Sequence, residues 1–320
     1  MSAAASGATI ALSIAAVERE TGLSKDTLRV WERRYGFPVP QRDAVGERSY
    51  PIDQVDKLRV VKRLLDGGHR PGRVVPMPVQ ELQDLADAVA PPSAEAGAPG
   101  LIPSFLDLIR GHNVAALKRE LGQALSRAGA SRFVNDIVAP LNVAVGDAWL
   151  RGQMEVFEEH LYTEAVQVVL RQAIAGMPEP ARGGGPCVLL STLPGEPHGL
   201  GLLMAETTLT LEGCPCVSLG VQTPVWDMAR AAQAQRVDVV ALGFTGCMNP
   251  NQVVLGLQAL RAQLAPSVAV WAGGAAPVLY RRRVDGVEPI PSMQALAMKA
   301  QLWRAAQARL RDLPPGVTAS

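Results

Sequence analysis

The residues with the clearest capacity for chemistry are a carboxylate and a histidine two positions apart, Glu196 and His198, in the segment LPGEPHGLG. An imidazole nitrogen is a common ligand of transition metals, and a carboxylate on the other ring nitrogen fixes the tautomer and the orientation of the ring. Taken alone, the two residues also fit an ordinary polar loop. His198 is therefore a candidate metal ligand whose interpretation depends on the elements that position it.

The sequence after residue 186 alternates between strand-like and helix-like patterns. The strand-like runs are CVLLSTL (187–193), CVSLG (216–220), VDVVALGF (237–244) and VAVWAGG (268–274), and helical patterns follow near 200–212, 226–235, 251–264 and 293–311. Strands that are apolar on both faces and separated by helices predict a parallel sheet covered on both sides. Strand–helix units repeated over this length favour the flavodoxin-like (Rossmann-type) order 2-1-3-4-5, with a ligand cleft at the carboxyl ends of the strands.

Residues that suit a ligand cleft follow three of these strands. They are Glu196, His198 and Gly201 after the first strand, Thr245 and Gly246 after the third, and Gly273 and Gly274 at the end of the fourth. Glycine pairs permit a close approach of the backbone to a ligand. Because the carboxyl ends of parallel strands meet at one edge of a sheet, we expect these residues to lie together.

This order of residues resembles the cobalamin-binding domain of corrinoid enzymes and sensors, whose usual pattern is Asp-x-His-x-x-Gly, Ser-x-Leu and Gly-Gly. Here Glu196 replaces the aspartate and Thr-Gly-Cys at 245–247 replaces Ser-x-Leu, and both changes keep the hydrogen-bonding atom. The resemblance implies that His198 binds the lower face of cobalt and that Glu196 holds its other ring nitrogen. It also implies that the displaced nucleotide tail of the cofactor runs beside residue 245 and the glycine pair at 273–274.

The N-terminal residues predict a helix-turn-helix. In KDTLRVWERRYG, Leu28 and Trp31 are three residues apart and face inward, whereas Arg29 and Arg33 are four apart and face outward. Two short helices joined by a tight turn that contains glycine form this motif, and its second helix enters the major groove of DNA. Two arginines on an arbitrary helix would ordinarily be solvated surface charges. The interpretation as a DNA-binding helix therefore depends on the order of the surrounding elements.

The next segment, PQRDAVGERSY, predicts a small hairpin, and another helix follows from Asp53 with Val55, Leu58, Val61 and Leu65 on its buried side. This order resembles the DNA-binding domain of MerR-family regulators over residues 11–75. The resemblance implies contacts with base edges or phosphates from Thr27, Arg29 and Arg33, and with the DNA backbone from Arg42, Arg48 and Tyr50. Since one such module binds weakly, it also implies a dimer or tetramer on double-stranded operator DNA with two-fold symmetry.

Residues 101–176 predict a four-helix bundle, with helical patterns near 103–111, 113–128, 130–149 and 155–175. One segment, WLRGQMEVFEEHLYTE at 149–164, carries Trp149, Glu159 and His160. Acidic residues in a first helical turn suit the helix dipole, and a lone histidine there is ordinarily partly buried. The segment therefore has a structural explanation beside any functional one.

The spacing from Trp149 to Glu159 and His160 resembles the segment that contacts the adenosyl group in light-sensing MerR-type repressors of the CarH/LitR type. The resemblance implies adenosylcobalamin as the cofactor, capped by the bundle. Some of these photoreceptors carry, directly after the tryptophan, a histidine that binds cobalt once light has expelled the adenosyl group. Leu150 stands at that position here and cannot bind a metal, which leaves His160 or water for the vacated site.

Charge and composition restrict the function classes. The net charge of +1 conceals an asymmetry, because residues 1–75 carry 13 Lys/Arg against 9 Asp/Glu and the remainder carries 18 against 21. Only the first part is therefore expected to meet a polyanion. The sequence has no apolar run of the ~20 residues that a membrane span needs, no convincing signal peptide, and four cysteines, which fit a reducing cytoplasm.

Composition also predicts the domain boundaries. A stretch rich in Pro, Ala, Gly and Ser before residue 100 indicates a linker, and AGMPEPARGGGP at 175–186 separates helix-like from strand-like sequence. The predicted segments are 8–78 (winged helix-turn-helix, otherwise all-α), 79–100 (linker), 101–178 (four-helix bundle) and 184–312 (α/β domain).

The sequence thus predicts a cytoplasmic DNA-binding transcriptional regulator, a repressor rather than an enzyme, whose oligomeric state and operator binding depend on adenosylcobalamin and light. It shows no assembled nucleophile–base pair and no phosphate-binding P-loop. Two alternatives remain open. One is a MerR-type regulator that senses another ligand, a tetrapyrrole or a redox signal through the same fold, and the other is a corrinoid methyl-carrier module, against which the DNA-binding domain argues.

Overall fold

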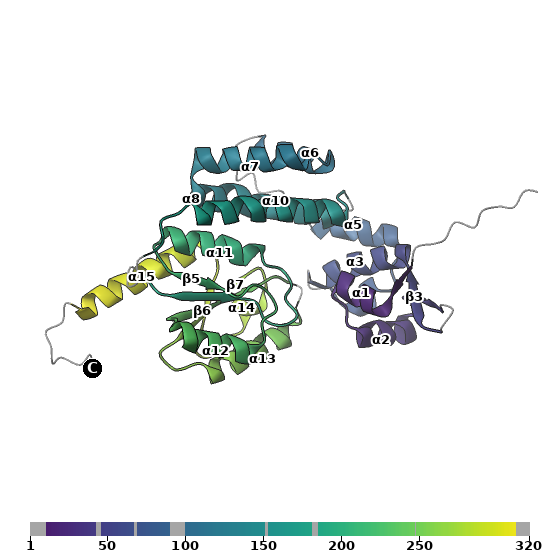
Figure 1. Cartoon of the computed structure of the whole chain (residues 1–320). Coiled ribbons are helices and arrows are strands. Elements are labelled where there is room, and N and C mark those ends of the chain that lie inside the picture. The colour runs from purple at the N-terminus through teal and green to yellow at the C-terminus, as the bar shows by residue number, and fades with distance from the viewer. Residues whose placement is uncertain are drawn as a thin grey trace, which may run out of the picture. The chain divides into compact units, whose positions relative to one another are not determined.

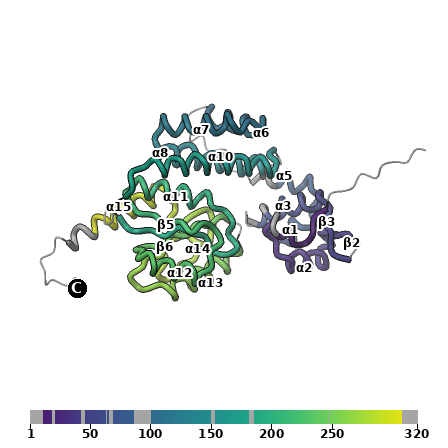
Figure 2. The backbone as a smooth tube through the Cα atoms, viewed as in Figure 1, coloured from purple at the N-terminus to yellow at the C-terminus, as the bar shows by residue number. Residues whose placement is uncertain are grey.

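The computed structural model describes residues 11–42, 46–66, 69–89, 100–150, 153–180, 185–246 and 248–311 (Figure 1). The chain divides into two compact units. One consists of Met1–Ala94 with Gly146–Met154, and the other consists of Glu95–Val145 with Glu155–Ser320. The tube in Figure 2 follows the same path from the N-terminal helices through the bundle to the sheet.

The helix-turn-helix is confirmed, and serine caps begin both of its helices. Helix α1 (Ile14–Thr21) begins after Ser13, whose hydroxyl accepts a hydrogen bond from the Ala16 N–H, and ends at Gly22 in the left-handed conformation (φ 67°). Helix α2 (Lys25–Tyr35) begins after Ser24, whose side chain accepts from the Thr27 N–H. Capping of this kind satisfies backbone donors that a helix start leaves unpaired.

The predicted wing is confirmed as an antiparallel hairpin of β2 (Gln41–Arg42) and β3 (Arg48–Pro51). A third strand that the sequence did not reveal, β1 (Ala11–Ser13), pairs with the other edge of β3. Helix α3 (Ile52–Asp66) follows directly. Its buried side differs from the prediction at one position, because Leu64 is buried and Leu65 only half-buried.

The predicted linker 79–100 is wrong in its first part. Residues Val79–Val89 form helix α5, which follows the short helix α4 (Pro71–Val74) and packs against α3. Leu82 is fully buried in the same apolar cluster as Leu28 and Leu58. The amphipathic pattern of residues 79–89 therefore forms a helix, although the sequence after it has the composition of a linker. Residues 90–99, which hold that Pro/Ala-rich stretch, lie outside the described residues.

The four helices of the bundle are confirmed, and the third is more complex than predicted. The segments are α6 (Leu101–Arg110), α7 (Val114–Ala128), α8 (Ala130–Arg132), the π-helical η1 (Phe133–Val138), α9 (Ala139–Leu150) and α10 (Val156–Ala175). A π-helical insertion widens the helix locally, and η1 buries Phe133, Val134, Ile137 and Val138. Helix α10 packs on α6, α7 and α11 (Leu200–Leu211).

The α/β domain is confirmed as a parallel sheet in the order β5-β4-β6-β7-β8, which is 2-1-3-4-5 by position along the chain. The strands are β4 (Val188–Ser191), β5 (Cys216–Ser218), β6 (Val239–Phe244), β7 (Ala269–Gly274) and β8 (Val287–Ile290). β8 is an addition to the four strands read from the sequence. Because every β4 residue is buried and β6 is nearly so, both faces of the sheet must be covered.

Helices cover the two faces of the sheet separately (Figure 1). Helix α11 packs with α15 (Met293–Arg311) on one face, where Leu190 and Trp271 lie in one apolar cluster. On the other face lie α12 (Val225–Gln235), α13 (Pro250–Gln263) and α14 (Val278–Arg281), over a second cluster that includes Leu242 and Val270. Among the described residues, no helix has both the length and the apolar composition that crossing a membrane would require.

Candidate cofactor and nucleic-acid sites

The carboxyl ends of β4 and β6 bring together Glu196, His198 and Thr245. Strands β4 and β6 are parallel neighbours, so the loops that follow them meet at one edge of the sheet. The Glu196 Oε1 atom lies 2.6 Å from His198 Nδ1. From the other loop, the Thr245 N–H donates to Glu196 Oε2 at 2.7 Å and the Thr245 hydroxyl donates to both carboxylate oxygens at 2.9 and 3.0 Å.

The Glu196 carboxylate is fully buried, and its partners keep it ionised. Burial by itself raises the pKa of Glu196, but the hydrogen bonds from His198 and Thr245 outweigh burial and the pKa lies below its usual value. An ionised carboxylate can only accept, so Nδ1 of His198 donates to it. The His198 side chain is 54% exposed, and a neutral ring with its proton on Nδ1 is the form that binds a transition metal through Nε2.

The glycines of the predicted cleft differ in whether the structure requires glycine at their positions. Gly201 lies in the first turn of α11, and a Cβ there would meet no atom within 4 Å, so packing does not explain it. At Gly274, by contrast, φ is 121° and a Cβ would overlap the carbonyl oxygen of Phe244, so the strand pairing itself requires glycine. A Cβ at Gly273 would lie 3.0 Å from the Ile290 carbonyl oxygen. Gly246 is half-buried, and Cys247 lies outside the described residues.

Glu159 and His160 lie in the first turn of α10. The Thr163 hydroxyl donates to Glu159 Oε1 at 2.8 Å, and His160 Nε2 lies 3.6 Å from Glu159 Oε2. The His160 side chain is 70% exposed, which corrects the reading of a partly buried histidine. Trp149 is half-buried near the end of α9, and Leu150 ends that helix. Because Trp149 belongs to the other compact unit, the predicted group of three is divided between the units.

A second histidine–carboxylate pair was not found from the sequence. Glu158 is buried, closes a capping box with Glu155 at the start of α10, and has its Oε1 atom 3.0 Å from His112 Nε2. The His112 ring also packs edge-on against Phe157 at 5.1 Å. His112 lies 46 residues before Glu158, in the turn between α6 and α7, so no local pattern could have joined them.

A metal site built from protein ligands alone is absent from the described part of the chain, where no three His, Cys, Asp or Glu side chains converge. Cys214 lies two residues before β5, and Cys216 is the first residue of that strand. Burial raises the pKa of the Cys214 thiol to about 11 and that of Cys216 to about 12, so both remain protonated near neutral pH. A single exposed imidazole at the edge of the sheet suits a metal that arrives with its own ligands.

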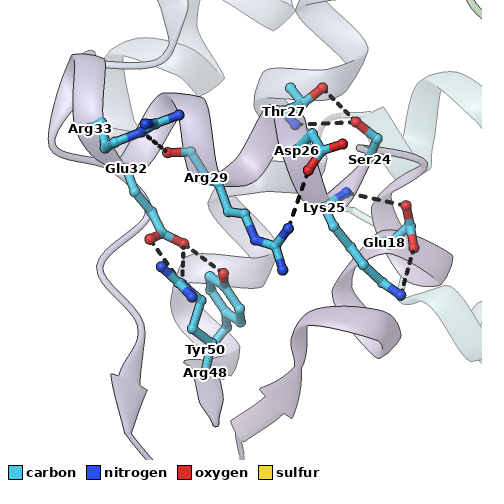
Figure 3. Close-up of polar contacts among 10 residues, drawn as sticks. All are labelled: Glu18, Ser24, Lys25, Asp26, Thr27, Arg29, Glu32, Arg33, Arg48 and Tyr50. Atoms are coloured by element: carbon cyan, nitrogen blue, oxygen red, sulfur yellow. Dashed lines mark hydrogen bonds and ion pairs between the residues drawn. The ribbon is translucent and has the colours of Figure 1, made fainter.

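Helix α2 presents the predicted basic surface (Figure 3). Arg29 and Arg33 are exposed. The Arg29 Nη1 atom donates to Asp26 Oδ1 at 3.2 Å, and Arg33 Nε donates to the Arg29 carbonyl oxygen at 3.4 Å. Thr27 is half-buried and part of the cap, with its hydroxyl 2.8 Å from that of Ser24. The two arginines thus lie on the outer face of the second helix of the motif.

Glu32 of helix α2 joins the wing to this helix through an ion pair and a hydrogen bond, and the sequence did not indicate this role. Arg48 Nε lies 3.1 and 3.2 Å from the two oxygens of Glu32, and the Tyr50 hydroxyl donates to Glu32 Oε1 at 2.7 Å (Figure 3). Tyr50 is fully buried, so the prediction that it contacts the DNA backbone is wrong; it holds Glu32 in place instead. Arg42 is exposed on β2 and donates to the Gly46 carbonyl oxygen at 2.7 Å.

Comparison with known proteins gives matches over both parts of the chain. Residues 12–75 match the model of the MerR HTH family regulatory protein, and residues 101–173 match a B12 binding domain. The HTH-type transcriptional repressor CarA of Myxococcus xanthus is 30% identical over 259 residues, which cover 78% of this chain and 83% of CarA. The repressor CarH of the same organism is 29% identical over 259 residues, covering 80% and 86%. The regulator MlrA of Escherichia coli K12 is 42% identical over 48 residues, covering 15% of this chain and 20% of MlrA.

Proposed function

Because this chain belongs to the MerR family of transcriptional regulators that carry a B12-binding domain, we propose that it is a repressor whose operator binding is controlled by adenosylcobalamin. The observation that carries the proposal is the hydrogen-bonded group of Glu196, His198 and Thr245 at the edge of the sheet. Its donor set, one imidazole oriented by a buried carboxylate, fits a cobalt ion that already has ring ligands of its own.

His198 is proposed to hold the cofactor through Nε2. Glu196 and Thr245 keep the imidazole ring oriented, since the carboxylate receives hydrogen bonds from both loops and cannot turn away without breaking them. Gly201, for which packing gives no reason, leaves room beside the histidine for a bulky ligand. When bound, adenosylcobalamin would supply a cobalt–carbon bond that light can cleave.

The helical bundle is proposed to cover the other side of the cofactor with Trp149, Glu159 and His160. The matched B12 binding domain spans this bundle, which supports the assignment. Glu159 is held by Thr163, whereas His160 is exposed and able to meet a ligand. Leu150 offers no metal-binding atom, so a histidine bound on this side would have to be His160.

Operator binding is proposed to use the outer face of α2 and the wing. Arg29 and Arg33 are exposed on the helix that is proposed to enter the major groove, and Arg42 and Arg48, opposite each other in the paired strands of the wing, are proposed to bind phosphates. One module reads one half-site, so the repressor is proposed to act as a dimer or tetramer. A ligand can change that assembly only by binding one state more tightly than another.

The experiment that tests the cofactor assignment is an absorption spectrum recorded with adenosylcobalamin in darkness. The wild-type protein should retain the corrinoid through a gel-filtration column in a form in which histidine has replaced the nucleotide base. His198→Ala should lose the corrinoid or leave its base bound to cobalt, while His69→Ala, outside the site, should behave as wild type. Retention of an unchanged spectrum by His198→Ala would refute the assignment.

A further inference from the structure

The indole of Trp271 carries a buried hydrogen-bond donor that is not used. Trp271 lies in the middle of β7, 1% exposed, and in the described part of the chain its Nε1 atom has no hydrogen-bond partner. It belongs to an apolar cluster on the side of α11 and α15 that includes Leu190, Leu202 and Leu296. Buried indole N–H groups ordinarily find an acceptor, and one that does not calls for an explanation, such as a missing ligand.

The sheet beside Trp271 is lined by very small residues. In the parallel register, Ala241 of β6 is opposite Trp271 and Gly243 is opposite Gly273. Because side chains alternate along a strand, these four residues point to the same face of the sheet. Ala241, Gly243 and Gly273 therefore place no side-chain atom beyond a Cβ beside the large aromatic ring.

The stripe formed by Ala241, Gly243 and Gly273 leads from the proposed cofactor site toward the indole. Gly274, at the end of β7, is exposed, Gly273 is half-buried, and Trp271 lies about 7 Å further along the strand. On β6 the same direction runs from Thr245 through Gly243 to Ala241. A Cβ at Gly243 would lie 3.1 Å from Leu202 Cδ2, so a single flexible side chain of α11 covers this position.

The resemblance to cobalamin-binding domains implies that the nucleotide tail lies beside Thr245 and the glycine pair at 273–274, and we propose that Trp271 Nε1–H donates a hydrogen bond to this tail. The inference rests on the proposed function and adds a positioning residue within the chain's interior. The tail carries phosphate, ribose and base atoms that accept hydrogen bonds, and a corrinoid without the tail offers none there. Trp271 thus selects a complete cobalamin over a truncated corrinoid.

Binding constants of two ligands and two variants test the proposal. Trp271→Phe keeps an aromatic side chain but removes the donor together with the five-membered part of the indole, so it should weaken adenosylcobalamin binding by about 3- to 10-fold. It should leave the affinity for adenosylcobinamide, which lacks the nucleotide tail, at the wild-type value. The control Trp226→Phe, on the exposed face of α12, should alter neither affinity. Equal affinity of Trp271→Phe and wild type for adenosylcobalamin, or equal weakening for both ligands, would overturn the inference.

A second measurement follows the donor itself. The five tryptophans give five indole N–H resonances, and the signal missing from Trp271→Phe identifies residue 271. That signal should move downfield when adenosylcobalamin is added and stay in place with adenosylcobinamide; no movement with either would count against the hydrogen bond. Because the donor has no partner in the free protein, Trp271→Phe loses no hydrogen bond on folding. If the wild-type protein binds no corrinoid, the proposed function fails and this inference fails with it. If the wild-type protein binds adenosylcobalamin and Trp271→Phe binds it equally well, only this inference fails.

Discussion

Nδ1 of His198 lies 2.6 Å from Oε1 of Glu196, a carboxylate without exposed surface. A buried charge is costly unless it is paired and hydrogen-bonded, and here the partners come from two loops that are 49 residues apart in sequence. The fold therefore keeps an ionised carboxylate in place at the edge of the sheet. The consequence is a histidine ring with a fixed tautomer, facing the region where ligands of this sheet topology bind.

The first prediction concerns that carboxylate. Glu196→Gln should lower the affinity for adenosylcobalamin by about 10- to 100-fold, because the neutral amide no longer fixes the proton on Nδ1 of His198. Equilibrium dialysis in darkness measures the change. The matched control is Glu179→Gln, at an exposed position outside the site, which should bind as wild type. Wild-type affinity in Glu196→Gln would show that the pair does not orient a ligand.

The second prediction concerns DNA recognition by α2. Arg29→Ala should weaken binding to an operator duplex, selected by the loaded protein from a random pool, by about 1–3 kcal/mol if the guanidinium reads a base edge. Cobalamin uptake should not change. Arg283→Ala, an exposed arginine of the α/β domain, serves as the control in the same gel-shift assay. Unaltered operator affinity in Arg29→Ala would exclude this arginine from the interface.

The third prediction concerns Tyr50 and the wing. Burial first, and then the hydrogen bond to Glu32, raise the pKa of Tyr50 well above its usual value. The folded state therefore keeps the neutral hydroxyl, and the resulting stability is complete below pH 10, the usual tyrosine value, and is lost as the pH rises beyond it. Tyr50→Phe should cost about 1–3 kcal/mol of unfolding free energy at pH 7.

The same variant gives a test by pH. The difference in melting temperature between wild type and Tyr50→Phe should narrow as the pH rises above 10, because only the wild-type protein has this hydroxyl to titrate. Measurements of thermal unfolding at pH 7, 9 and 10.5 follow the difference. A gap that widens with pH would contradict the position of Tyr50 as a neutral donor to Glu32.

The fourth prediction bears on redox sensing, the alternative signal. Since burial raises the pKa values of Cys214 and Cys216 to about 11 and about 12, neither thiol forms a thiolate at pH 8. Peptide mapping should find both unmodified after an hour with iodoacetamide, and both alkylated in 8 M urea. Rapid alkylation of the folded protein at either cysteine would reopen the redox alternative.

Much of the α/β domain follows from local pattern, because buried parallel strands are continuous apolar runs and their order obeys simple rules. β8 was missed since VEPI carries a charge and a proline and has no buried residue. β1 has three residues, too few for any alternation to show. In α5, composition misled the interpretation, because the burial of Leu82 depends on a tertiary contact with α3.

The sites could likewise be predicted only where their residues are close in sequence or where the order of the strands brings them together. Glu196 and His198 are two residues apart, so their pairing could be predicted from the sequence. The proximity of Thr245 could be predicted from the expected order of the strands. Glu32 lies 16 residues from Arg48, and recognising their ion pair required knowing how the wing folds onto α2. The unused donor of Trp271 is also a property of the folded interior, because an apolar strand gives no sign of whether its indole finds an acceptor.

The central claim, that a corrinoid controls DNA binding, is tested most directly by operator affinity measured with and without adenosylcobalamin. A gel-shift titration of the selected duplex should show tight binding by the loaded protein in darkness, weak binding by the protein without corrinoid, and loss of the tight complex after green illumination. Equal operator affinity with and without adenosylcobalamin in darkness would contradict the account.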